Sequence, residues 1–272
     1  MLRAAAFFAL TSVALTASPL QAQRSDQAWL NSCEDESWRE SRVKHCEIRE
    51  TGLKRSTGVL TVDPGMNGGV EIIGWDRDSI AVTARIQTSA RTDDEAEAIA
   101  REIKIEAAGG TVHATGPDPL GRHQSWSVSF IVSVPHKIDL SIGTENGPLS
   151  VSDVSGHMEL STLNGPLALN GVAGDVHARA QNGPLTVGLE GTRWDGAGLD
   201  AATMNGPADL RIPEGYNARI EFGTVNGPMH VGFPLTVTLS GRITDRISTT
   251  LGSGGAPVRV VTTNGPMTVR RW

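Results

Sequence analysis

Residues 158–187 read MELSTLNGPLALNGVAGDVHARAQNGPLTV, and this stretch contains two copies of the repeat that decides the fold. The tripeptide Asn-Gly-Pro begins at Asn146, Asn164, Asn182, Asn205, Asn226 and Asn264, with spacings of 18, 18, 23, 21 and 38 residues. Recurrence at such a period is typical of a chain built from stacked structural units. The last spacing is twice 19, so we expect one further unit between Asn226 and Asn264, with its corner at Gly252–Gly255.

Apolar residues alternate with polar ones on both sides of each motif. The residues three and five positions after the Asn are Leu149, Val151, Leu167, Leu169, Leu185, Val187, Ala208, Leu210, Met229, Val231, Met267 and Val269. Those six and four positions before it are Leu140, Ile142, Met158, Leu160, Val176, Ala178, Leu199, Ala201, Ile220, Phe222, Val258 and Val260. Strict alternation predicts strands with one buried face. The residues between them, such as Glu159 and Thr186, are expected to face solvent.

The corner itself has a sequence signature. A threonine stands two positions before the Asn in every copy except one, where the residue is Ala180. Its methyl group can pack inward while its hydroxyl bonds a neighbouring turn. Asn and Gly tolerate the positive φ that we expect at a sharp corner, and Pro can open the next strand. Asn-Gly is also a hairpin signal, so the motif alone does not distinguish hairpins from stacked coils.

The repeat period favours an all-β fold in which two short strands and two corners form each unit of 18–21 residues. Identical corners in successive units would then stack about 4.8 Å apart. We therefore predict a β-solenoid or β-roll with Asn-Gly-Pro corners, and an antiparallel β-sandwich is the alternative. Upstream, Asn67-Gly68-Gly69 is expected to start another unit, with Val70 and Ile72 facing inward.

One helix is expected near 92–104, because Thr92 and Glu95 form a capping box and Ala96 and Ile99 share a face. It would cover an end or flank of the sheets, where an open edge invites aggregation. Longer strands are predicted on either side of it, over 80–86 and 126–134.

Composition and charge exclude several classes of partner. The 272 residues carry 24 Lys and Arg against 30 Asp and Glu, a formal net charge of −6, without a cluster of basic residues. Nucleic acids and anionic membrane surfaces are bound through such clusters. We therefore expect neither nucleic-acid binding nor binding to an anionic membrane surface. No second apolar stretch approaches the roughly 20 residues of a membrane-spanning helix, so we expect no membrane insertion of the mature chain.

The first residues predict export. Met1–Ala22 has a basic residue, Arg3, followed by an apolar run too short to span a bilayer comfortably, which is typical of a signal peptide, although a retained anchor is the alternative. The leader 23–57 then contains Cys33 and Cys46. In an oxidising compartment they are expected to form a disulfide, with a metal site including His45 as the alternative. The repeat domain would occupy 58–272.

No catalytic, cofactor-binding or metal-binding residue is predicted. The histidines are dispersed, and a metal site from His157, His177 and His230 would require outward faces of different units to align. Asp76 and Asp78 lack the further oxygen ligands of a calcium loop. Nucleophile and phosphate-binding motifs are absent from the sequence.

The signal peptide, the Cys-containing leader, the stretch Asn67–Asp76 and the tandem Thr-x-Asn-Gly-Pro strands together resemble the adhesin-like β-strand-repeat family of bacterial envelope proteins. The resemblance covers Gly58 to Trp272, and here Pro replaces the Gly common after Asn-Gly. Because its motifs are structural, it implies export, to the periplasm or beyond the cell, and a non-catalytic envelope role, and it transfers no catalytic residue.

Three functions follow as expectations. The first is a non-enzymatic exported protein that binds an envelope protein or a glycan, or acts as a scaffold. The second is an envelope-stress or signalling module that partners a membrane regulator. The third is a carbohydrate-active solenoid that would use carboxylates sharing one register: Glu159, Asp200 and Glu221.

Overall fold

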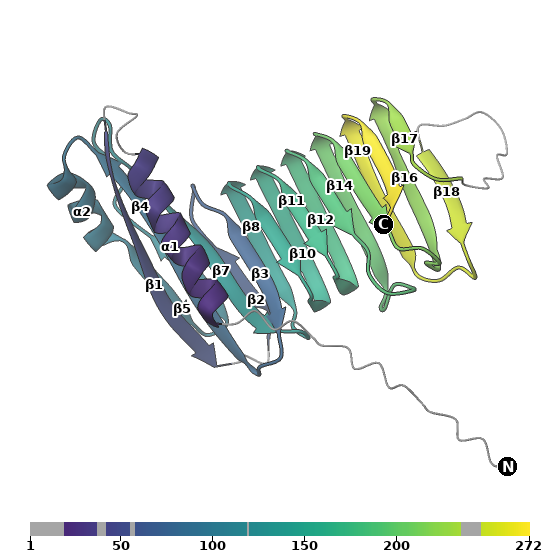
Figure 1. Ribbon diagram of the computed structural model, residues 1–272, viewed down its shortest axis with the longest axis horizontal. Helices are drawn as coiled ribbons and strands as arrows, with labels where there is room; N and C mark the ends of the chain where they lie inside the picture. The colour runs from purple at the N-terminus through teal and green to yellow at the C-terminus, as the bar shows by residue number, and fades with distance from the viewer. Residues whose placement is uncertain (1–18, 37–41, 55–57, 119, 235–245) are drawn as a thin grey trace, which may run out of the picture.

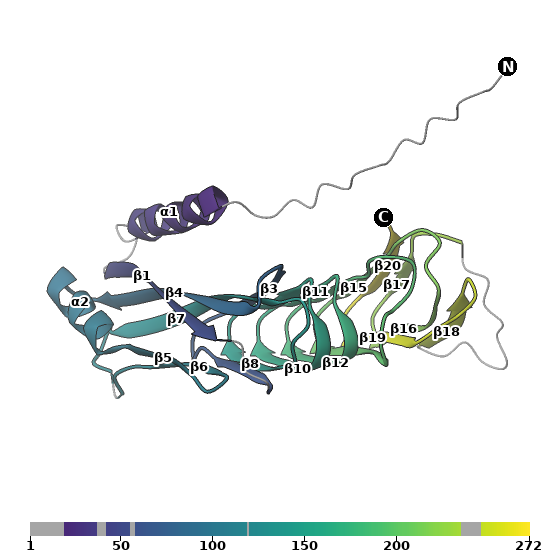
Figure 2. The same cartoon turned by 90° about the horizontal axis from the view of Figure 1, so that it is seen from below.

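The computed structural model describes residues 19–36, 42–54, 58–118, 120–234 and 246–272. In these residues two mixed β-sheets of ten strands each face one another (Figures 1 and 2). The prediction of an all-β fold is confirmed. Residues 1–18, most of the expected signal peptide, lie outside the described residues. No helix within the described ranges is both long and apolar enough to cross a membrane.

Each sheet has its own spatial order of strands. Sheet A consists, from edge to edge, of β1 (Val43–Lys54), β4 (Ser79–Ala90), β7 (Ser125–Pro135), β3 (Val70–Trp75), β9 (Leu149–Ser152), β11 (Leu167–Asn170), β13 (Leu185–Gly188), β15 (Ala208–Ile212), β20 (Met267–Arg271) and β17 (Met229–Val231). Sheet B consists of β18 (Arg246–Leu251), β16 (Ala218–Asn226), β19 (Pro257–Asn264), β14 (Gly198–Asn205), β12 (Ala173–Asn182), β10 (Ser155–Asn164), β8 (Leu140–Asn146), β2 (Leu60–Asp63), β6 (Thr111–Thr115) and β5 (Lys104–Ala108).

The repeat units alternate between the sheets. At each Asn-Gly-Pro the chain leaves sheet B and enters sheet A, and neighbouring units pair in parallel, for example Asn164 with Asn182 and Leu167 with Leu185. The unit expected at Asn67 is present, because Asn67 pairs with Asn146 and β3 pairs with β9. Antiparallel strands occur at the two ends of the stack, as β1–β4–β7, β5–β6 and β16–β18.

The predicted alternation is confirmed. All of the apolar positions that flank the motifs are buried between the sheets except Met229 and Val231, which are half-buried because β17 is an edge strand. The intervening residues point outward, as Glu159 and Thr186 show. One apolar layer therefore extends through all the units.

The corners stack too closely for any side chain on the glycine. A Cβ on Gly165 would lie 2.1 Å from the carbonyl oxygen of Gly147, and one on Gly183 would lie 2.0 Å from that of Gly165. The expectation that the corners need positive φ is wrong. None of the motif asparagines has positive φ, and among the motif glycines only Gly265 does. Close approach of neighbouring backbones, not backbone conformation, is what requires glycine.

Side chains connect the corners into a ladder. Asn164 Nδ2 donates to Asn146 Oδ1 at 2.9 Å, and the same bond recurs from Asn182, Asn205, Asn264 and Asn226 to the preceding unit in the stack. The threonine hydroxyls donate to corner carbonyls as expected, for example from Thr203 to Gly183 at 2.8 Å. Both groups therefore join the exposed corners of neighbouring units through hydrogen bonds.

The unit expected between Asn226 and Asn264 is not formed by the described residues there. The strand β18 runs antiparallel to β16, and Gly252–Gly255 is the turn from β18 to β19. The last unit, β19 and β20, lies instead between the units of Asn205 and Asn226, because β19 pairs with both β14 and β16. The long final spacing contains β17, the antiparallel strand β18 and the turn that leads into β19.

Helix α2 (Asp93–Glu102) is the predicted helix, and it covers the end of the sheets near β4 (Figure 1). Its cap forms as expected, with Glu95 N donating to Thr92 Oγ1 at 3.3 Å. Ala96 and Ile99 pack against Ala90 and Trp126.

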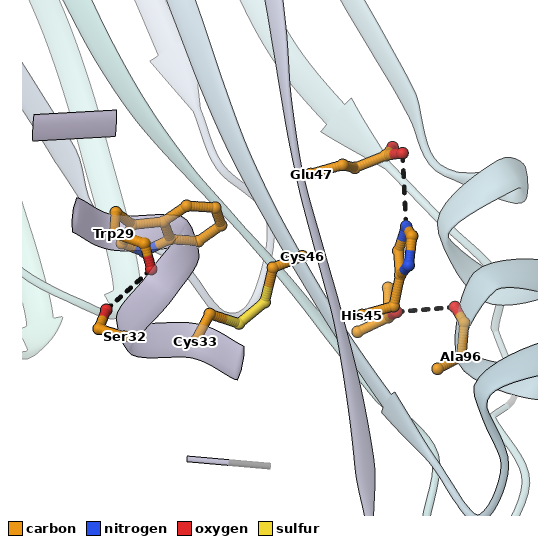
Figure 3. The surroundings of a disulfide bond; sticks show 8 residues. Trp29, Ser32, Cys33, His45, Cys46, Glu47 and Ala96 are labelled. Atoms are coloured by element: carbon orange, nitrogen blue, oxygen red, sulfur yellow. Dashed lines mark hydrogen bonds and ion pairs between the residues drawn. A yellow bond between two sulfur atoms is a disulfide. The ribbon is translucent and has the colours of Figure 1, made fainter. Parts of the chain in front are cut away.

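Helix α1 (Pro19–Glu36), which the sequence pattern does not predict, lies across the outer face of sheet A (Figure 2). The disulfide Cys33–Cys46, predicted from the sequence, joins α1 to β1 with a Cα–Cα distance of 6.5 Å (Figure 3). Arg85 on β4 adds an ion pair to Asp26 at 2.8 Å and lies over the ring of Trp29.

Candidate functional site

A shallow groove of about 710 Å³ crosses the outer face of sheet B. It is lined by Asp63, Gly143, Thr144, Glu145, Ser161, Thr162, Leu163, Arg179, Ala180, Gln181, Ala202, Thr203, Met204 and Thr263. These residues come from successive units, so the groove runs across the strands and not along one of them. The surface is hollowed here because the residues three positions before the Asn are small in several units. Examples are Gly143, Ser161 and Ala202.

A row of exposed residues that we call the rim row stands one position before the Asn of each corner. Five of its residues line the groove, and the first and the last lie beyond it. In stack order the rim row is Met66, Glu145, Leu163, Gln181, Met204, Thr263 and Val225. Apolar and polar side chains alternate without exception. Met66, Leu163, Met204 and Val225 are 64%, 41%, 51% and 45% exposed. Strands are about 4.8 Å apart, so an apolar side chain recurs roughly every 9.6 Å along the stack.

A second row on the same face, which we call the charged row, lies outside the lining of the groove, five positions before each Asn. In stack order it is Ser141, Glu159, His177, Asp200, Arg259 and Glu221. Here Arg259 lies between two carboxylates, with 2.6 Å from its Nη1 to Asp200 Oδ1 and 3.2 Å from its Nε to Glu221 Oε1. Arg179 forms a second ion pair with Asp200. Burial tends to raise the pKa of the Asp200 carboxyl, but hydrogen bonds and charges from Arg179 and Arg259 outweigh burial and lower that pKa from 3.8.

Two histidines and two carboxylates are linked by three contacts on the neighbouring strands β10 and β12. His157 Nδ1 lies 3.2 Å from Asp175 Oδ2, His177 Nε2 lies 3.3 Å from Asp175 Oδ1, and His157 Nε2 lies 3.6 Å from Glu159 Oε1. These contacts are pairwise. Among the described residues, no group of three or more His, Cys, Asp or Glu is arranged to hold a metal ion.

The structure brings together only some of the residues considered from the sequence. His157 and His177 are neighbours, with ring centroids 6.2 Å apart, but His230 is on β17 in the other sheet. Glu159, Asp200 and Glu221 do share one row of sheet B, yet the strand bearing His177 separates the first two and that bearing Arg259 separates the last two.

Asp76 and Asp78 lie in the turn between β3 and β4, away from the groove. Asp76 Oδ1 is 3.2 Å from His136 Nε2, and Arg77 stacks on the ring of Trp75. The turn is a polar connection between the two strands.

Sequence reasoning missed the rim row. The signal was present, because the residue before each Asn can be read as directly as the residues that alternate inward. Its pattern becomes regular, however, only when the last unit is placed between Asn205 and Asn226, which the sequence order conceals.

A second, smaller cleft of about 300 Å³ lies on the outer face of sheet A near α1, with Trp29, Arg85 and Glu71 among its lining residues. It is separated from the groove by the thickness of the molecule.

Comparisons with known proteins give distant likenesses. No family model matches the chain, and no curated protein matches it. Among solved structures, a "putative cell adhesion protein" from Clostridium sporogenes is 10% identical, with a TM-score of 0.46 over 84% of this chain and 100% of that one.

Two further solved structures are less similar. A "putative adhesin" from Bacteroides fragilis is 12% identical, with a TM-score of 0.30 over 83% of this chain and 97% of that one. A "putative lipid binding protein" from Parabacteroides distasonis is 7% identical, with a TM-score of 0.31 over 83% and 96%. At these TM-scores the likenesses carry no argument about this chain.

Proposed function

We propose that this chain is an exported, non-enzymatic binding protein of the bacterial cell envelope, similar in role to an adhesin, and that the outer face of sheet B is its recognition surface. The two sheets would form one continuous β-solenoid, whose regular units repeat the same outward side chains. The family resemblance of the sequence motifs supports export and the envelope location.

The observation that carries the proposal is the groove that crosses successive units. A groove along one strand would suit a short ligand, whereas this groove places equivalent residues side by side over six strands. The exposed apolar residues Leu163 and Met204 line the groove, so a partner lying across the strands would contact both of them. An extended polymer of the envelope, a glycan or a protein, fits this surface.

The ion pairs of the carboxylates in the charged row favour a binding role over glycoside hydrolysis. Asp200 and Glu221 are both held by Arg259. A general acid needs a raised pKa, and that of Asp200 is lowered. Glu159 faces a histidine, not a second carboxylate across an open gap.

The experiment is a retention assay with the chain from Gln23 onward. Immobilised protein is exposed to envelope extract and to a panel of cell-wall and extracellular polysaccharides, and both retention and product release are scored. Retention without turnover supports the proposal. Turnover of a polysaccharide that is lost in Glu159→Ala would overturn it.

A matched pair of variants tests whether the groove on sheet B is the binding surface. Leu163→Glu puts a charge on the border of the groove, and Val59→Glu puts the same charge on a comparably exposed apolar residue outside the groove. We expect retention to fall with Leu163→Glu and to stay unchanged with Val59→Glu. Equal effects of the two variants would remove sheet B as the surface.

A further inference from the structure

The last repeat unit occupies a slot in the middle of the stack. In sheet B, β19 pairs with β14 on one side and with β16 on the other, and in sheet A β20 pairs with β15 and β17. The units on either side are consecutive in sequence, and residues 257–272 fill the space between them.

Backbone register does not explain the insertion. Asn205 and Asn226 both align with Asn264, and the residues around them align equally. If β16 and β17 closed directly onto β14 and β15, Asn226 could donate to Asn205 Oδ1, the atom that Asn264 now uses. Thr224 could likewise donate to Gly206 O, which now accepts from Thr262.

The inward side chains do not select the order either. The residues that would meet on closure are apolar in both sheets, for example Ile220 with Leu199 and Met229 with Ala208. A stack in sequence order would keep the apolar layer and the ladder of asparagines.

The charges do distinguish the two orders. Asp200 and Glu221 both align with Arg259, so direct closure would place the two carboxylates opposite one another, which is destabilising in a sheet. Insertion places Arg259 between them and in contact with both. On sheet A, Arg270 of the last unit aligns with Arg211 of β15, and Asp209 lies between the two guanidinium groups, 3.1 Å from Arg270 Nε and 3.5 Å from Arg211 Nη2. The strand β17 offers no carboxylate.

We propose that the space between the Asn205 and Asn226 units is a strand-acceptor site whose carboxylates, Asp200, Glu221 and Asp209, select the arginine-bearing C-terminal unit. The backbone and the apolar residues would accept either order, and the alternation of charge decides between them. This selection is independent of the proposed binding role.

Disulfides between cysteines introduced on the rim row can distinguish the two orders of the repeat units. In the inserted order, Met204 and Thr263 are on neighbouring strands, while Met204 and Val225 are separated by one strand, about 9.6 Å. A disulfide needs Cα atoms within roughly 7 Å. The pair Met204→Cys and Thr263→Cys therefore reports insertion, and the pair Met204→Cys and Val225→Cys reports direct closure. All three residues are exposed.

The decisive variant exchanges two side chains: Glu221→Arg with Arg259→Glu, together with Asp209→Asn. Net charge changes only through Asp209. In this background the inserted order would place the carboxylate introduced by Arg259→Glu beside Asp200, and the closed order would alternate in sign. After refolding and oxidation, the closure disulfide, measured by mass spectrometry, should increase about tenfold over its trace level in the otherwise native chain.

A compensating substitution and a salt series complete the test. Adding Asp200→Arg restores alternation in the inserted order, so the closure disulfide should return to its trace level. If the exchange variant does not fold, refolding of the otherwise native closure pair in about 1 M salt, where charges are screened beyond roughly 3 Å, should raise the closure disulfide. An exchange variant that retains the insertion disulfide, or a salt-independent order, would overturn the proposal.

Discussion

Single atoms decide whether two corners can stack. A Cβ on Gly165 would lie only 2.1 Å from the carbonyl oxygen of Gly147, which is too close for any side chain. A similarly short distance is found at each motif glycine in the stack. Four corner carbonyls also accept a hydrogen bond from a threonine hydroxyl of the next unit in the stack, as Gly206 does from Thr262 at 2.8 Å. The motif Thr-x-Asn-Gly-Pro is therefore a set of contacts between units more than a turn within one.

Gly165→Ala should destabilise the chain by about 1–3 kcal/mol, because the added methyl meets backbone that cannot move without separating two strands. The control is Gly143→Ala, whose methyl would meet only Ser161 Oγ at 3.4 Å, an ordinary contact. Urea unfolding measures both variants. Equal stability of the two would show that the corners can relax.

Ala180→Thr should stabilise the chain by about 0.5–1.5 kcal/mol. Ala180 stands at the one motif position that lacks the threonine, and the carbonyl of Gly165 in the preceding unit is the acceptor that the new hydroxyl would reach. Ala180→Val supplies the same shape without the hydroxyl. A gain from Val as large as that from Thr would mean that packing, not the hydrogen bond, is responsible.

The sequence was most informative about the strands and about which of their side chains are buried. The period-2 pattern predicted which side chains are buried in every unit, and the two exceptions are on an edge strand. The capping box predicted α2. Helix α1 could not be predicted in the same way, because its contacts to the sheet depend on the Cys33–Cys46 disulfide and on Arg85, which are distant in sequence.

Adjacent residues of β11 test the alternation directly. Leu169 is fully buried and its neighbour Ala168 points outward. Leu169→Asp should unfold the chain because it buries an unpaired charge. Ala168→Asp should change the free energy of unfolding by no more than about 0.5 kcal/mol. Circular dichroism with urea titration measures both, and a folded Leu169→Asp chain would contradict the assigned register.

At the scale of the whole molecule, the order of the units was the feature that the sequence concealed. The connection from β15 to β16 has five residues, 213–217, where an ordinary connection such as 153–154 has two, but the connection 189–197 is longer still and skips no unit. Loop length therefore did not identify the insertion. The groove and the rim row depend on that order, so they were also beyond prediction from the spacing of motifs.

Acid should weaken the contacts between the last units. Because the pKa of Asp200 is lowered in the folded chain, its contribution to stability is complete above the ordinary value of 3.8 and is lost as pH falls through the lower folded pKa. Asp200→Asn should therefore flatten the acid side of the stability profile. Thermal unfolding between pH 2 and pH 6 measures this, with Asp63→Asn as the control on a carboxylate outside the charged row. A profile that Asp200→Asn leaves unchanged would contradict the assigned role of the Arg259 contacts.

The most direct test of the recognition surface is hydroxyl-radical footprinting of the mature chain with and without the envelope fraction that retains it. Met66, Leu163 and Met204 of the rim row are exposed, so their oxidation can be measured peptide by peptide, with Val59 as an exposed reference outside the groove. We predict protection of Leu163 and Met204 and unchanged oxidation of Val59. Full oxidation of the rim row in the bound state, with protection on sheet A instead, would contradict the account.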